Sequence, residues 1–208
     1  VLLVGFKHLL HDVLRAVGVH IAACQHDERR LLVVFRSRHL RLLQPGGEAP
    51  CIAAATFGRV RDYQVRDINN MGAAMAPAAA STLLHYFADT STEPQDFDCI
   101  YTGDLGQVGS QLLRELLAAE GLLLKNHVDC GCILFDAHEQ SVKSGGSGPG
   151  CCAAVLCGHI LPRLRRGSQK RVLFTATGAL MSQTTFLQKE TIPAVAHLVE
   201  LRAPEKEK

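Results

Sequence analysis

The feature that most constrains the fold is an alternation of strand-like and helix-like segments after residue 50. Short apolar runs at 51–57, 98–102 and 171–176 are typical of buried strands, and alanine- or leucine-rich stretches of helical length separate them. Strands separated by helices pair in parallel, with the crossover helices packed on the sheet. We therefore expect an α/β protein with a mixed, mostly parallel sheet flanked by helices.

Three stretches predict helices. The segment 71–89 is rich in alanine, but Pro77 falls within it. Proline is best tolerated in the first turn of a helix, so this helix is expected to begin near Ala76. The helix nearest the C-terminus is expected over 151–164, with Gly167 ending it.

The second helix is expected over 107–120, with Gly121 as the residue that ends it. Its apolar residues recur at helical spacing, which predicts one buried stripe. The stripe consists of Val108, Leu112, Leu113, Leu116 and Leu117.

Composition excludes several classes of protein. The formal net charge of the 208 residues is +2, too small to argue for a nucleic-acid partner, so none is predicted. No uncharged apolar run reaches the roughly 18 residues that a membrane span requires. The apolar segment 1–24 is interrupted by Lys7, Asp12 and Arg15, so we do not expect a signal peptide.

The chain contains eight cysteines. With no export signal evident, we expect them to be reduced. Cys130 and Cys132 are one residue apart, and Cys151 and Cys152 are adjacent, which is too close for the usual paired zinc ligands. No metal site is predicted, and most of these cysteines are interpreted as small buried side chains.

The first candidate loop, 102–106 (TGDLG), lies between a predicted strand and a predicted helix. Open α/β sheets bind ligands at this carboxyl end of their strands. Gly103 and Leu105 flank Asp104 on either side. Asp104 could act as a base, accept a hydrogen bond from a ligand, or cap the following helix. Taken alone, Asp104 is best explained as a helix cap.

The second candidate loop, 145–150 (GGSGPG), opens a predicted helix and contains Gly145, Gly146 and Ser147. The N–H groups and the positive end of a helix dipole can hold a carboxylate or a phosphate. The loop lacks the Gly-Lys-Ser/Thr of a P-loop and follows no buried strand, so no nucleotide or other cofactor is predicted. A plain turn is the alternative interpretation.

Three other features are weaker. The small residues of 175–182 follow a strand and suggest close backbone packing. Cys130 lies near His127, and a reactive thiolate needs such a neighbour, although a buried structural thiol is the simpler interpretation. His197 lies in an apolar strand, where a histidine is usually a hydrogen-bonded core residue.

Taken together, six segments resemble the stage V sporulation protein AD family, whose fold is thiolase-like. They are MGAAMAPAAASTLLHYFAD, DFDCIYTGDLGQVGSQLL, DCGCILFD, GGSGPGCCAAV, RVLFTATGALMS and TIPAVAHLVEL, in the order of the family. The resemblance runs from about Gln44 to about Ala203. It implies that residues 44–208 form the C-terminal βαβαββ half of a thiolase-like fold. Residues 1–43 match nothing in the family, as expected for a truncated or frame-shifted gene or for a divergent domain.

The resemblance implies a role in sporulation: binding dipicolinic acid, alone or with calcium, for uptake into the developing spore. It implies a peripheral location on the cytoplasmic side of the forespore or spore inner membrane. The implied partners are other stage V sporulation A proteins and a second copy of the chain, through a thiolase-type dimer.

In condensing enzymes of this fold, this half supplies a histidine and an asparagine that polarise a thioester carbonyl. The loop 102–106 looks like the histidine loop with Asp104 in its place, and Ser147 stands near the asparagine position. An anionic aspartate cannot replace a neutral histidine as an oxyanion donor, so no catalytic residue is predicted. The predicted ligand-binding residues are Gly103, Asp104, Leu105, Gly145, Gly146, Ser147, Cys130 and His197.

Two alternatives remain open. One is an acyltransferase whose nucleophile is Cys130 or a cysteine of the first half of the fold. The other is a structural subunit that contacts membrane proteins and binds no ligand. In either case, half of a thiolase-like fold exposes surfaces that the other half would bury, so we expect this chain to be unstable or oligomeric by itself.

Overall fold

The computed structural model describes residues 39–40, 50–136 and 139–204. The segment 1–43 lies outside the described residues except for His39 and Leu40, so the interpretation of that segment remains a prediction. Cys24, which belongs to it, also lies outside the described residues.

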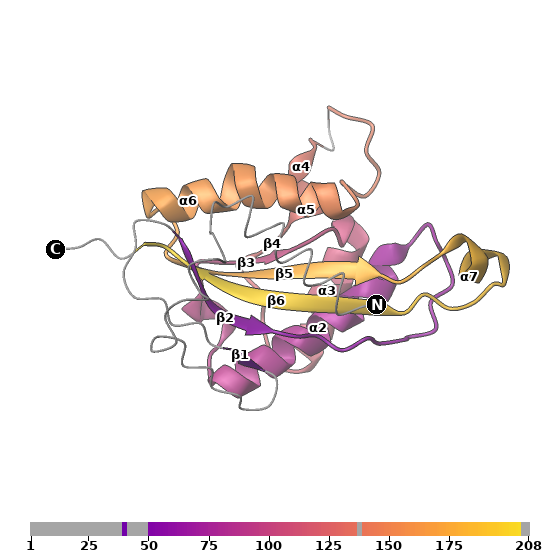
Figure 1. The fold of residues 1–208 in the computed structure, drawn as a ribbon, viewed down its shortest axis with the longest axis horizontal. Coiled ribbons are helices and arrows are strands. Elements are labelled where there is room, and N and C mark those ends of the chain that lie inside the picture. Colours follow the sequence, from indigo (N-terminus) through magenta and orange to yellow (C-terminus); the bar gives the residue numbers. More distant parts are fainter. Residues whose placement is uncertain (1–38, 41–49, 137–138, 205–208) are drawn as a thin grey trace, which may run out of the picture.

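The described residues form one six-stranded sheet with the strand order β1-β2-β6-β5-β3-β4. β3 pairs in parallel with β4 and β5, whereas β6 lies antiparallel between β5 and β2. The sheet is therefore mixed, with β2, β5, β3 and β4 running in one direction, as predicted (Figure 1). The strands are β1 (His39–Leu40), β2 (Cys51–Thr56), β3 (Cys99–Thr102), β4 (His127–Asp129), β5 (Arg171–Ala179) and β6 (Ala194–Arg202).

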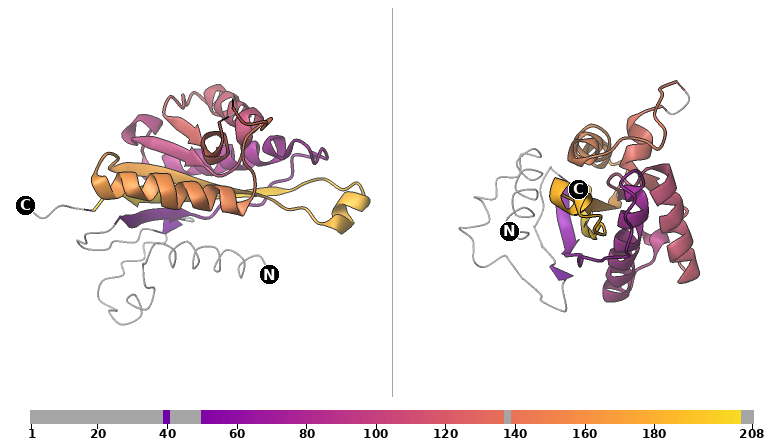
Figure 2. Two further views of the ribbon diagram at one scale, coloured as in Figure 1. Left: turned by 90° about the horizontal axis from the view of Figure 1, so that it is seen from above. Right: turned by 90° about the vertical axis from the view of Figure 1, so that its right-hand side faces the viewer.

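Helices cover both faces of this sheet, with α2 and α3 on one face and the helix formed by α5, η3 and α6 on the other (Figure 2). The predicted alternation is confirmed, and between α3 and the glycine-rich loop the structure adds the short strand β4 and the short helix α4. The helical elements are α2 (Met71–Thr90), η2 (Pro94–Asp96), α3 (Gly106–Ala119), α4 (Cys130–Leu134), α5 (Pro149–Val155), η3 (Leu156–Ile160), α6 (Leu161–Arg166) and α7 (Gln183–Leu187).

Two apolar cores hold the layers together. The larger lies between the sheet and the alanine-rich α2, where small side chains allow close approach, and it extends to Leu113 and Leu117 of α3. The smaller lies between the other face of the sheet and the helix 149–166, and it contains Tyr101, Ile160 and Leu164. Strands β3, β5 and β6 each contribute to both cores, and β6 and β5 are the middle pair of the sheet.

Helix α2 begins at Met71, so the predicted start near Ala76 is wrong. The side chain of Asn70 caps the helix by accepting a hydrogen bond from the N–H of Ala73, at 3.3 Å. A Cβ added to Gly72 would lie only 2.5 Å from the carbonyl oxygen of Leu105. The first turns therefore pack tightly against the start of α3, and this packing outweighs the hydrogen bond that Pro77 removes.

The buried face of α3 is narrower than the predicted stripe. Leu113 and Leu117 are buried, but Val108 and Leu116 are 48 % and 39 % exposed. Small residues at Gly106, Gly109 and Ser110 occupy the rest of the buried face. A Cβ on Gly109 would lie 2.9 Å from Cα of Gly72 in α2, and one on Gly106 would lie 2.6 Å from the carbonyl oxygen of Ser144. The predicted helix-ending glycines are confirmed, with φ of +81° at Gly121 and +73° at Gly167.

None of the helices formed by the described residues has the length and apolar character of a membrane span. The cysteines in the described ranges are all free thiols, and no group of three or more potential ligands could hold a metal ion among those residues.

Candidate functional site

The two predicted loops meet at the carboxyl end of β3 and β4. The carboxylate of Asp104 accepts a hydrogen bond from the N–H of Gly148 through Oδ2, at 2.7 Å. Next to it, the N–H of Gln107 donates to the carbonyl oxygen of Ser144, at 2.8 Å. The loop that carries Asp104 and the glycine-rich loop therefore touch through both side-chain and backbone groups.

Asp104 joins three segments that are distant in the sequence. Its Oδ1 accepts a hydrogen bond from Oγ1 of Thr177 at 3.0 Å, and the same hydroxyl accepts from the N–H of Asp104 at 3.2 Å. Leu105 is the residue that precedes α3, and no side chain of its own caps that helix. The helix-cap interpretation of Asp104 is thus wrong, because its carboxylate is used to fasten the glycine-rich loop to the end of β5.

The cap of α3 comes instead from Asp129, the last residue of β4. Its Oδ1 accepts from the N–H of Leu105 at 3.0 Å and from Oγ1 of Thr102 at 2.6 Å, and its Oδ2 accepts from the N–H of Gly106 at 3.0 Å. Burial raises the pKa of the Asp129 carboxyl, and these hydrogen bonds offset only part of that effect. Sequence reasoning missed Asp129, because only the register of β3 and β4 places it beside the helix start.

The glycine-rich loop packs against the start of α4 by direct backbone contact. The N–H of Gly146 donates to the carbonyl oxygen of Gly131 at 2.7 Å, and a Cβ on Gly131 would lie 2.5 Å from the carbonyl oxygen of Gly146. Gly145 has φ of +115°, a conformation that side chains with a Cβ rarely adopt. Glycine is thus required here for close approach as well as for the turn.

Cys130 lies beside this contact but is fully buried. Burial, followed by the neighbouring Asp129 carboxylate, raises the pKa of the Cys130 thiol far above its ordinary value. Burial likewise raises the pKa of Cys151 to about 11. A nucleophilic cysteine needs a thiolate at neutral pH, and neither environment supports one.

His197 makes its contacts elsewhere. Its Nδ1 accepts a hydrogen bond from the N–H of Gly58 at 3.2 Å, and its ring meets that of Phe57 edge-on at 6.3 Å between centroids. Burial lowers the pKa of His197. The structure therefore brings Gly103–Leu105, Cys130 and Gly145–Ser147 together, whereas His197 packs on the segment that follows β2.

The sequence comparisons agree with this fold. The sequence profile of stage V sporulation protein AD matches residues 37–202. The chain is 45 % identical over 147 residues to the stage V sporulation protein AD of Bacillus subtilis (strain 168). The chain belongs to the stage V sporulation protein AD family.

The match to this family begins slightly before the predicted boundary at residue 44. The aligned region covers 70 % of this chain and 43 % of the Bacillus relative, so the chain spans less than half the length of that family member.

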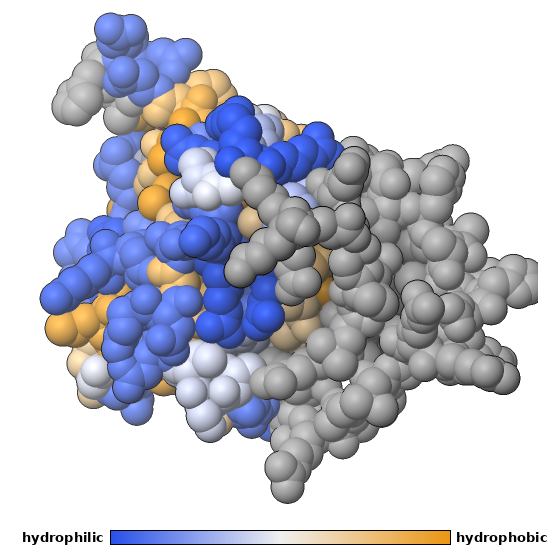
Figure 3. All heavy atoms as spheres, turned by 90° about the vertical axis from the view of Figure 1, so that its left-hand side faces the viewer, coloured by the Kyte–Doolittle hydropathy of each residue, from blue (hydrophilic) through white to orange (hydrophobic). Residues whose placement is uncertain are grey.

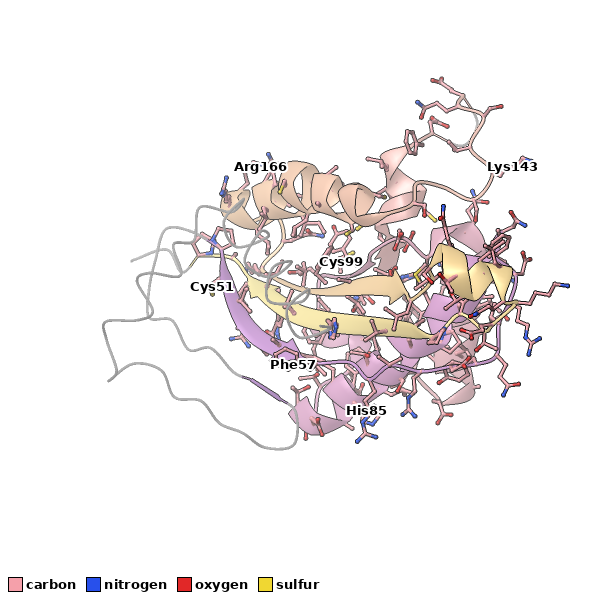
Figure 4. All side chains as sticks on the ribbon, turned by 45° about the vertical axis from the view of Figure 1, so that its right-hand side comes forward. Cys51, Phe57, His85, Cys99, Lys143 and Arg166 are labelled. Carbon is pink, nitrogen blue, oxygen red and sulfur yellow. The ribbon has the colours of Figure 1, made fainter. Side chains whose placement is uncertain are left out.

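Among the described residues, two hollows on the surface of this family member lie away from the two loops. One, of about 580 Å³, lies beside α7 and is lined by Arg66, Leu180, Thr185, Gln188, Lys189, Glu190, Thr191 and Pro193. The other, of about 190 Å³, lies between the end of β2 and α2 and includes Phe57 and His85 (Figure 4). Neither is lined by residues of the two loops.

Proposed function

We propose that this member of the family binds dipicolinic acid, alone or with calcium, at the two joined loops and contributes without catalysis to dipicolinate uptake during sporulation. The observation that carries the proposal is the hydrogen bond between Asp104 and the N–H of Gly148, at 2.7 Å, which joins the two loops at the carboxyl end of β3, where open α/β sheets generally bind ligands. The role in sporulation follows from the family; the ligand is our proposal.

The glycine-rich loop offers accessible backbone to an anionic group. Ser147 is exposed, and Cβ atoms added to Gly148 or Gly150 would meet nothing within 4 Å. A flat dicarboxylate could therefore approach the start of the helix 149–166, whose dipole favours negative charge. Among the described residues, each Asp104 oxygen accepts one hydrogen bond, which leaves a lone pair suited to calcium or to a protonated ring nitrogen.

The same geometry weighs against the acyltransferase alternative. Asp104 accepts hydrogen bonds where a condensing enzyme donates them, and the thiol of Cys130 is buried. Incubation with an acyl-coenzyme A followed by mass mapping separates the two functions. We expect no acyl adduct; an adduct on any cysteine of the chain would favour the enzyme.

We further propose that the chain acts peripherally at the forespore inner membrane with other stage V sporulation A proteins, and that it associates with a second copy of itself. Its exposed apolar side chains support association, and they include Val108, Leu116, Ile133 and Phe135. Sedimentation of the isolated chain is expected to show an oligomer or an aggregate. A monodisperse monomer with one sharp, cooperative melt would contradict this.

Calorimetric titration with dipicolinate, with and without calcium, tests the ligand. We expect saturable binding that weakens in Asp104→Ala and is unchanged in Glu120→Ala, a matched loss of an exposed carboxylate at the far end of α3. Benzene-1,3-dicarboxylate, which lacks the ring nitrogen, is expected to bind more weakly. Equal binding of both dicarboxylates, or no binding by the wild type, would refute the proposal.

A further inference from the structure

A chain of buried polar side chains lies directly beneath the loop that carries Asp104. Nε2 of His127 is 2.9 Å from Oγ1 of Thr102, which is 2.6 Å from Oδ1 of Asp129. Thr102 and Asp129 are partners in the parallel register of β3 and β4, and His127 is two residues before Asp129 on the same face of β4. The strand register alone therefore aligns the three side chains.

The hydrogens in this chain have only one consistent arrangement. A carboxylate with three donors around it accepts only, so the single hydroxyl hydrogen of Thr102 points to Asp129. Thr102 must then accept from His127, which fixes the proton of that imidazole on Nε2. Nδ1 of His127 is buried with no hydrogen-bond partner among the described residues, and burial, with the nearby Arg114, lowers the pKa of His127 to about 4.

Asp129 controls both loops of the candidate site. It holds the N–H groups of Leu105 and Gly106, which α3 does not cap by itself. Two residues further along the chain, Gly131 accepts the hydrogen bond from Gly146 of the glycine-rich loop. The end of β4 is therefore the common support on which the two loops are placed.

We propose that Asp129, oriented by Thr102 and His127, is a positioning residue that sets the placement of the Gly103–Leu105 loop and thereby the affinity of the site for its dicarboxylate ligand. The proposal rests on the proposed function and extends it to residues that do not touch the ligand. His127 stays neutral at physiological pH, so it orients the threonine hydroxyl by donating one fixed hydrogen bond.

The test compares Thr102→Val with Thr102→Ser in the full chain. Valine keeps the shape of the side chain but removes the hydroxyl, whereas serine keeps the hydroxyl and so serves as the rescue. We expect valine to lower dipicolinate affinity about tenfold and serine to stay within about twofold of the wild type. Amide shifts of Leu105 and Gly106 are expected to move in the valine variant only.

Long-range ¹⁵N spectra of His127 give a readout that a general loss of stability would not change. The wild type and the serine variant are expected to show the Nε2–H tautomer alone, and the valine variant a mixture of tautomers. If the valine variant fails to fold, His127→Ala on the edge strand replaces it, with an expected affinity loss of about threefold.

The proposal is overturned if removing the hydroxyl or the imidazole leaves the affinity and the Leu105 and Gly106 amide shifts as in the wild type. It is also overturned if the wild-type imidazole carries its proton on Nδ1. No dipicolinate binding by the wild type would instead refute the proposed function and, with it, the effect on affinity. The amide shifts and the tautomer would then decide whether Asp129 positions the loop.

Discussion

Two buried carboxylates lie on strands of the same sheet, Glu200 on β6 and Asp129 at the end of β4, and their surroundings differ. Glu200 and Asp129 are each only 2 % exposed. Glu200 accepts hydrogen bonds from Nε of Arg171 and of Arg202, both at 2.7 Å, and from the hydroxyl of Tyr86 at 2.5 Å. Figure 3 shows the side of the molecule where β6 ends, and the described surface there is mostly hydrophilic with apolar patches between. The hydroxyl of Thr102 and the N–H groups of Leu105 and Gly106, which donate to Asp129, are all neutral.

The difference appears in the pKa values. Burial alone raises the pKa of Glu200, but the hydrogen bonds from Arg171, Tyr86 and Arg202 outweigh it and leave the pKa below its ordinary value. At Asp129 burial prevails and the pKa is raised. The arginines around Glu200 therefore neutralise its charge and favour stability. Asp129 accepts no hydrogen bond from a cationic side chain within the described ranges, a pattern typical of functional sites.

The largest effect is expected at Glu200. Glu200→Ala leaves Arg171 partly buried without its partner, so the free energy of unfolding should fall by about 3 kcal/mol in urea titrations. Arg202→Ala is the matched control, because that side chain is 51 % exposed and its pairing should contribute less than about 1 kcal/mol. Equal losses of unfolding free energy in the two variants would contradict a special role for the buried Glu200 carboxylate.

A smaller loss is expected at Asp129. Asp129→Asn keeps one acceptor oxygen but turns an amide N–H₂ toward backbone donors, and it should lower the free energy of unfolding by about 2 kcal/mol. Asp98→Asn serves as a control, since this carboxylate also accepts from two backbone N–H groups, those of Lys170 and Arg171, but is exposed. If the Asp98 variant lost as much, burial would not be the cause.

Lowering the pH should change the free energy of unfolding in opposite directions through the two carboxylates. A lowered pKa at Glu200 contributes stability that is present above pH about 4.5 and is lost as the pH falls. A raised pKa at Asp129 works in the opposite direction, because the folded state takes up its proton first. Between pH about 5 and 3, Glu200→Gln should therefore lose stability less steeply than the wild type, and Asp129→Asn more steeply. Parallel curves would contradict the assignment.

The smallest effect on stability is expected at Asp104. Its hydrogen bonds to Gly148 and Thr177 are only partly buried. Thr177→Val should therefore lower the free energy of unfolding by less than about 1 kcal/mol. The amide shift of Gly148 should nevertheless change, because Asp104 is no longer held in place. Thr177→Ser should retain the wild-type shift. An unchanged Gly148 amide in the valine variant would show that Asp104 needs no support from β5.

The sequence predicted the elements that depend on local pattern. The strand at 98–102, the glycine ends of two helices and the meeting of two loops at one sheet edge all follow from periodicity, turn chemistry and the direction of parallel strands. The start of α2 was not predictable, because it depends on the contact between Gly72 and Leu105. The role of Asp129 also depends on a contact between distant segments. It follows from the register of β3 and β4, in which Thr102 and His127 are separated by 25 residues in the sequence.

The central claim is that the two joined loops bind dipicolinate, and amide chemical-shift mapping during a dipicolinate titration tests it most directly. The account predicts saturable shifts concentrated at Gly103, Leu105 and residues 145–148, with residues beside α7 unaffected. Shifts confined to the hollow lined by Arg66 and Lys189, or no shifts at the two loops, would contradict it.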